Sequence, residues 1–189
     1  MKYSEFLIKY KRKIVIGLIL LGILLKIFII QTSTHSLLRY STGNIALVIA
    51  ILGILLRSWA TGMINKGKTL TCNGPFHLCR NPQYLGSLLI GIGVILALNS
   101  VYLWVLFIIL PLVYMPKIKA EERYLMAVFK DDFQKYKRLT GMFYPKKISF
   151  GMFLCNWSCK QWLKNKEYNT WIAAIVGGIL FETVKTFTR

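Results

Sequence analysis

Residues 68–93 read KTLTCNGPFHLCRNPQYLGSLLIGIG, a polar loop that continues directly into an apolar segment. The loop contains Gly74-Pro75 and Asn81-Pro82, two pairs that fix turns and remove helical freedom, so we predict an ordered connection. The apolar segment begins at Tyr84 and extends to residue 98. The hydrogen-bond donors and aromatic rings of the loop are therefore expected where water meets lipid.

Long apolar blocks, rather than apolar residues at helical spacing, dominate the rest of the chain. Four of them are predicted as membrane-spanning helices, and the longest, at 1.5 Å per residue, crosses most of a hydrocarbon layer of about 30 Å. These blocks are residues 14–30, 44–56, 84–98 and 101–115. A short fifth block, residues 171–184, is either a fifth span or an embedded helix. The sequence thus predicts an all-α, multi-span transmembrane protein with four to five spans.

The composition favours a membrane protein and argues against a nucleic-acid partner. Of the 189 residues 55% are hydrophobic, and the formal net charge is +18. Lys and Arg neutralise phosphates in nucleic-acid-binding proteins. Here they gather beside the apolar blocks, which is typical of loops held against anionic lipid. We therefore expect the lipid bilayer as a partner, and no nucleic acid.

The four cysteines predict neither a disulfide framework nor a metal centre. Cys72, Cys79, Cys155 and Cys159 are irregularly spaced for a framework in a chain of this length. Cys155 and Cys159 are four residues apart and can share a helical face, yet both histidines lie far away in the sequence. Reduced or lipid-facing thiols are the expectation.

The distribution of Lys and Arg predicts the topology. The amino terminus and residues 57–83 and 117–169 are rich in cations, whereas the connections at 31–43 and 99–100 are poor in them. By the positive-inside rule the cation-rich segments face the cytoplasm. The polar loop and the carboxylates that follow residue 120 are then on the same, cytoplasmic side.

The distribution of apolar blocks and cations suggests that the chain has three parts. Residues 1–56 are an N-terminal transmembrane pair, and residues 57–145 hold the loop, a helical hairpin and an amphipathic helix with two glutamates. Residues 146–189 are a basic and aromatic interfacial tail that ends in a short hydrophobic helix. Trp157 and Trp162 alternate with lysines there, as is typical of a segment at the membrane surface.

Ionisable side chains near the bilayer are functional candidates, because charge is costly there. Arg80 presents a planar fork that suits a carboxylate or phosphate, and an arginine that reaches the lipid headgroups is an equal interpretation. Glu121 can accept from an amine or hydroxyl of a ligand, and Glu122 can pair with Arg80 or Lys119. A solvated helix start explains both glutamates equally well.

The glycines Gly91 and Gly93 lie inside the apolar segment. They lack the strand, the turn and the third glycine of a dinucleotide-binding fingerprint, so that motif is excluded. Close helix packing, or the close approach of a flat ligand, is predicted instead.

One combination of residues resembles a known family. It consists of Gly74-Pro75-Phe76, the run RNPQYLG at 80–86, the run EERYL at 121–125, and Phe129, Asp132, Phe133 and Tyr136. Across residues 53–145 it is similar to the isoprenylcysteine carboxyl methyltransferase and phospholipid N-methyltransferase family. The resemblance implies a membrane-embedded enzyme that uses S-adenosylmethionine and a lipophilic substrate.

The resemblance also implies a set of cofactor-binding residues. Asparagine at position 81 replaces the family's usual histidine, which keeps a hydrogen-bonding side chain and excludes a histidine base there. Phe76 stands where the family usually has a tyrosine. The implied cofactor residues are Lys68, Thr69, Leu70, Thr71, Phe76, Asn81, Pro82, Gln83, Tyr84 and Glu121.

Two cations are the expected substrate-binding residues. Lys117 falls where some family members place a substrate-binding arginine, and a point charge there would bind an anion with less geometric selectivity. Arg80 is the second. No catalytic residue is assigned, because a sulfonium methyl is already activated and the enzyme mainly positions the nucleophile and excludes water.

The acceptor and two other functions stay open. A carboxylate acceptor needs no base, whereas an amine must first lose a proton, and a prenylcysteine carboxylate, a lipid amine and a thiol all remain candidates. A membrane reductase of the sterol-reductase kind, which uses NADPH, resembles the same helical core. A non-enzymatic membrane scaffold or lipid-binding protein is the other alternative.

Overall fold

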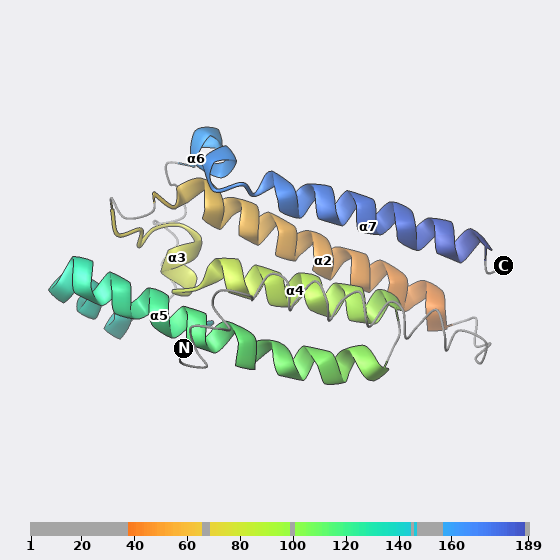
Figure 1. The fold of residues 1–189 in the computed structure, drawn as a ribbon, viewed down its shortest axis with the longest axis horizontal. Coiled ribbons are helices and arrows are strands. Elements are labelled where there is room, and N and C mark those ends of the chain that lie inside the picture. The colour runs from red at the N-terminus through yellow and green to blue at the C-terminus, as the bar shows by residue number, and fades with distance from the viewer. Residues whose placement is uncertain (1–37, 66–68, 99–100, 145, 147–156, 188–189) are drawn as a thin grey trace, which may run out of the picture. The chain divides into compact units, whose positions relative to one another are not determined.

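The computed structural model describes residues 38–65, 69–98, 101–144, 146 and 157–187 (Figure 1). Every regular element in this part of the chain is a helix, which confirms the all-α prediction there. The predicted first span at 14–30, together with Lys68 and Cys155, lies outside the described residues.

The described residues form two compact units. One contains residues 38–53 and 87–136, and the other contains residues 54–86 and 137–187. The predicted three-part division at 1–56, 57–145 and 146–189 stays a prediction.

Helix α2, Leu38–Met63, is longer than the predicted span at 44–56. It begins six residues earlier and continues past Arg57, so the predicted end at 56 is wrong. Within the helix the Arg57 guanidinium is paired with the carboxylate of Glu167. In the described part of the chain, one helix is long and apolar enough to cross a membrane, at Asn44–Met63. The four-crossing topology stays a prediction.

Helix α4, Pro82–Leu98, packs closely on α2. A Cβ atom at Gly93 would lie 2.7 Å from the Ala46 carbonyl oxygen and 2.8 Å from the Ala50 Cβ. These separations are too short for any larger side chain without a shift of the helices. Of the two predictions for Gly93, close helix packing is therefore the one that the structure shows.

Helix α5, Val101–Leu139, joins the predicted fourth span and the amphipathic stretch in one element of 39 residues. The helix continues through Pro111 and Pro116. Its backbone departs from helical geometry at Lys130, where φ is 40° and ψ is −113°. A proline in an apolar helix is tolerated where neighbouring groups satisfy the carbonyl that it frees.

Two helices follow near the end of the chain. Helix α6, Cys159–Lys164, is capped by Ser158, whose side chain accepts from the backbone N–H of Gln161. Helix α7, Tyr168–Phe187, begins three residues before the predicted apolar block. In Figure 1 α6 and the first turn of α7 lie beside the carboxyl end of α2. The exposed apolar side chains of α7 include Ile172, Ile175, Val176, Ile179 and Leu180.

Candidate functional site

The polar loop between α2 and α4 is ordered by its Gly-Pro turn. Gly74 has φ 59° and ψ −131°, a conformation that glycine adopts without steric cost. Pro75 follows as the first residue of the short helix α3, Pro75–Leu78, where its fixed φ is suited to a helix start. Phe76 is buried in this turn. The predicted order of the loop is confirmed at this turn.

The Asn81-Pro82 pair forms the start of α4. The backbone carbonyl of Asn81 accepts from the backbone N–H groups of Tyr84 and Leu85, at 3.1 Å and 3.0 Å. The Asn81 side chain is buried, and its Nδ2 donates to the Met142 carbonyl at 3.4 Å. Asn81 therefore fixes the first turn of α4 and ties it to the segment after α5.

Arg80 lies at the carboxyl end of α5. Its backbone N–H donates to the Gly141 carbonyl at 2.9 Å, and its Nη1 donates to the carbonyls of Lys137 and Thr140. The last carbonyls of a helix have no partner within the helix, and an arginine can satisfy them. These contacts give Arg80 a structural role at the helix end. Its expected role in substrate binding stays a prediction.

The thiol of Cys79, between these elements, is buried. Burial raises the pKa of Cys79 to about 11, against smaller opposing effects of a backbone hydrogen bond from Asn81 and the charge of Arg80. At neutral pH the group is therefore a thiol rather than a nucleophilic thiolate.

Lys117 and Glu121 pair with each other on α5. The Lys117 Nζ lies 3.4 Å from Glu121 Oε1, and the two side chains are 34% and 48% exposed. A pair four residues apart on a half-exposed helix surface contributes only about 0.3–0.5 kcal/mol. Each side chain can therefore exchange its partner for a ligand at little cost.

The structure places the predicted residues in two groups. Phe76, Asn81, Pro82, Gln83 and Tyr84 lie together around α3 and the start of α4, after Thr69, Leu70 and Thr71. The Thr71 hydroxyl donates to the Met63 carbonyl at 3.5 Å, at the end of α2. Lys117 and Glu121 belong to the other compact unit, and their approach to the loop stays a prediction.

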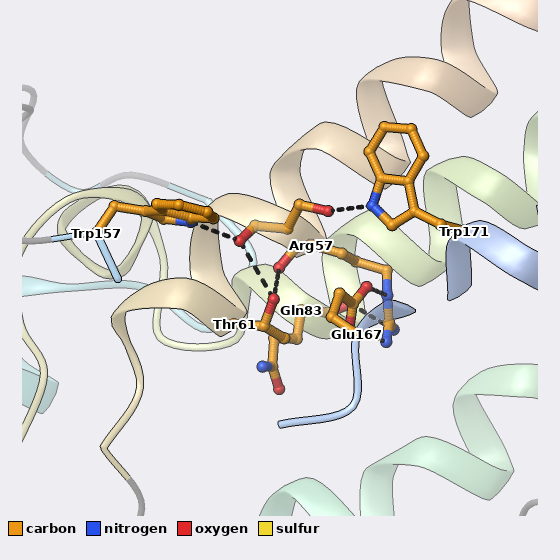
Figure 2. A network of polar contacts seen from close by, with 7 residues as sticks. Arg57, Thr61, Gln83, Trp157, Glu167 and Trp171 are labelled. Atoms are coloured by element: carbon orange, nitrogen blue, oxygen red, sulfur yellow. Dashed lines mark hydrogen bonds and ion pairs between the residues drawn. The ribbon is translucent and has the colours of Figure 1, made fainter. Parts of the chain in front are cut away.

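A third set of polar residues was missed at the sequence level. Figure 2 shows Arg57 bound to Glu167, with Trp157 and Trp171 against the same end of α2. The sequence did indicate that Glu167 needs a partner, because it is a single acidic residue after Lys160, Lys164 and Lys166. An acid in a basic segment near a membrane is a candidate for an ion pair, but its partner is not visible from local sequence.

No metal centre is found among the side chains that the structure describes: none of their His, Cys, Asp and Glu residues form a group of three or more that could hold an ion. The cysteines in this part of the chain, Cys72, Cys79 and Cys159, are free thiols.

The described part of the chain is thus all-α, with an apolar helix of membrane-spanning length and a polar segment with a Gly-Pro turn between two apolar helices. Comparison with protein families matches residues 12–132 to the phospholipid methyltransferase family. The match covers more than half of the 189 residues, so the chain belongs to the phospholipid methyltransferase family. The family resemblance proposed from the sequence is confirmed by this match.

A curated relative shares part of this region. Over 111 residues the chain is 34% identical to the cobalt-zinc-cadmium resistance protein CzcN of Cupriavidus metallidurans, a match that covers 53% of this chain and 49% of that protein. The chain therefore spans about half the length of this relative. No solved structure gives a significant match.

Proposed function

We propose that the protein is an integral-membrane methyltransferase that takes its methyl group from S-adenosylmethionine and transfers it to a lipophilic acceptor at the cytoplasmic face. The observation that carries the proposal is the family match, which contains the loop and the Asn81-Pro82 start of α4. The cofactor residues are those that the resemblance assigns between Lys68 and Tyr84, together with Glu121.

The side chains fit the chemistry of this cofactor. Its ribose hydroxyls and ammonium group require an acceptor, and the Glu121 carboxylate is half exposed and forms a weak surface pair with Lys117. Thr69 and Thr71 supply hydroxyl groups in the loop, and Gln83 supplies an amide. When bound, the cofactor supplies an activated methyl group on a sulfonium. The residues of the chain bind and orient it and exclude water.

Lys117 supports an acceptor with a negative charge. Its ammonium group lies beside Glu121 and is one third exposed, so it can bind a carboxylate or a phosphate next to the proposed cofactor carboxylate. A prenylcysteine carboxylate would be methylated directly: the new bond joins its oxygen to the methyl carbon, and the methyl–sulfur bond breaks. A lipid amine would first lose a proton to a base. Methylation of a carboxylate therefore needs only the assigned residues, whereas methylation of an amine also needs a base.

Binding of S-adenosylhomocysteine to the purified full chain in detergent tests the proposal. We expect saturable binding that Glu121→Gln weakens by about tenfold, the scale of a lost charge-assisted hydrogen bond. Asp131→Asn is the matched control, because Asp131 is an exposed carboxylate on the same helix. Absence of binding, or equal binding by Glu121→Gln and the wild type, would contradict the proposal.

Membranes that contain the protein then identify the acceptor. We would add methyl-labelled S-adenosylmethionine together with either a farnesylcysteine analogue or phosphatidylethanolamine vesicles, and measure the label in each lipid. Label in the first assigns O-methylation, and label in the second assigns N-methylation. Oxidation of NADPH without methyl transfer would support the reductase instead, and inactivity in all three assays would support a scaffold.

A further inference from the structure

Arg57 joins the two ends of the cofactor loop. The loop leaves α2 at Met63 and enters α4 at Pro82. From the last turns of α2, the Arg57 Nη1 donates to the Gln83 carbonyl in the first turn of α4, at 3.4 Å. Gln83 belongs to the proposed cofactor segment. The position of that segment relative to α2 therefore depends on the orientation of the Arg57 side chain.

Glu167 determines that orientation. Its two carboxylate oxygens accept from Arg57 Nε at 2.9 Å and from Nη2 at 3.1 Å, a bidentate pair that holds the plane of the guanidinium (Figure 2). The Glu167 side chain is 3% exposed and that of Arg57 is 23% exposed. A buried carboxylate without its cation costs free energy, so rotation of either side chain out of the pair is unfavourable.

Residues 157–171, the tail segment, hold Glu167 at this place. The indole N–H groups of Trp157 and Trp171 donate to the backbone carbonyl and the hydroxyl of Ser58, at 3.0 Å and 2.7 Å. The side-chain amide of Asn165 donates to the carbonyls of Thr61 and Ile64, at 2.8 Å and 3.0 Å.

The Asn165 contact with Thr61 satisfies a carbonyl that the end of α2 leaves open. The backbone N–H of Ser158 adds a further bond to the Gly62 carbonyl at 3.0 Å. The tail segment is therefore attached to the last two turns of α2, immediately before the cofactor loop. It lies outside residues 12–132, the part of the chain that matches the family.

We propose that Glu167, acting through Arg57, is a positioning residue for the methyl-donor site, and that the tail segment is a required part of that site in this chain. The inference rests on the proposed function, because it assigns Gln83 and the loop to the cofactor. Glu167 touches neither cofactor nor acceptor in this arrangement. Its effect passes through the guanidinium to the Gln83 carbonyl.

The test compares full-length variants in detergent by two measurements. One is the Kd for S-adenosylhomocysteine, and the other is hydrogen exchange of the backbone amides in residues 69–85, measured without nucleotide. In Glu167→Gln the amide keeps the shape of the side chain but loses its charge. We expect faster exchange in the loop and a Kd raised about tenfold, because small misplacements at a site have effects of this size.

Three further variants separate positioning from general stability. Trp171→Phe removes one bond between the tail segment and α2 but leaves the Arg57–Glu167 pair, so we expect a lower melting temperature with the Kd within about twofold of the wild type. The charge exchange Arg57→Glu with Glu167→Arg restores an ion pair but places a carboxylate, which cannot donate, beside the Gln83 carbonyl, so it should not recover the affinity that Glu167→Gln loses. Arg57→Lys keeps the charge but cannot bind both oxygens and Gln83, and it should resemble Glu167→Gln.

Each result is decisive. Unchanged exchange and unchanged Kd in Glu167→Gln would overturn the inference and leave the proposed function intact. So would a rise in Kd that Trp171→Phe reproduces at an equal loss of melting temperature, since the tail segment would then act on stability alone. Failure of the wild type to bind S-adenosylhomocysteine would overturn the proposed function, and this inference with it.

Discussion

The Lys117 ammonium lies 3.4 Å from the Glu121 carboxylate, one turn further along α5. The resemblance assigns these two side chains to different ligands, an anionic acceptor and the cofactor. In the described chain they neutralise each other at a half-exposed site. Because such a pair is weak, binding of either ligand can break it without a large loss of free energy.

Substitution of Lys117 should separate acceptor binding from cofactor binding. Lys117→Met removes the cation and keeps the length of the side chain. We expect the KM for an anionic acceptor to rise about tenfold, because one charge-assisted contact is lost. The free energy of unfolding should change by less than about 0.5 kcal/mol. Steady-state kinetics and denaturant melts measure both, and an unchanged KM would remove Lys117 from the acceptor site.

Gly93 should be sensitive to any added side chain. Gly93→Ala places a Cβ within 3 Å of the α2 backbone, and overpacking of this kind typically costs about 1–3 kcal/mol. Gly178→Ala is the matched control, since a Cβ there meets nothing within 4 Å and alanine favours a helix by up to about 1 kcal/mol. Thermal melts in detergent compare the two variants. Equal stability of both would contradict the close α2–α4 contact.

Cys79 should be unreactive at neutral pH. In chains that keep a single cysteine, Cys79 should react with maleimide much more slowly than Cys159, which is exposed, because burial raises the pKa of Cys79 to about 11. Rates measured from pH 7 to 9 test this. Equal rates for the two cysteines would show that Cys79 is accessible as a thiolate.

The same pKa shift predicts a pH dependence of stability. The folded chain holds the Cys79 proton more tightly than the unfolded chain, whose thiol has the ordinary pKa of 9.0. The contribution of the protonated Cys79 thiol to the unfolding free energy is therefore complete below pH 9 and is lost as the pH rises toward 11. The difference in unfolding free energy between the wild type and Cys79→Ala should decrease over that range. A constant difference would contradict the shift.

Asn165 should stabilise the end of α2. Asn165→Ala leaves the carbonyls of Thr61, in the last turn of α2, and of Ile64, just after it, without their side-chain donor, which should cost about 1–2 kcal/mol. Asn169→Ala is the matched control, an exposed asparagine at the start of α7. Denaturant melts measure the difference. A loss of stability no larger than that of Asn169→Ala would show that water replaces the Asn165 amide.

Several features could be predicted because their signals are local. The apolar blocks indicate helices, and Gly74-Pro75 and Asn81-Pro82 indicate turns at the places where the structure has them. The close packing at Gly93 follows from a glycine inside an apolar helix. Each of these depends on residues within a few positions of one another, so one sequence is enough.

Other features could not be predicted because the partners are distant in the chain. The span was expected to end before Arg57, yet α2 continues past it, and Arg57 pairs there with Glu167, 110 residues later. The hydrogen bonds from the Arg80 guanidinium to carbonyls at the end of α5 were not predicted, while its expected role in substrate binding stays a prediction. Arg57 and Arg80 each have several suitable partners in the sequence, and the hydrophobic periodicity does not indicate which partner each one contacts.

The sequence by itself determined the helical class, the family and the loop with its two proline turns. These follow from hydrophobic length and turn chemistry, which are properties of contiguous residues. The tertiary structure decided which charges pair, which helix ends are capped, and that residues 157–171 attach to α2 beside the loop. A charge or an open carbonyl accepts any complementary group within reach, and the packing of the backbone sets which group that is.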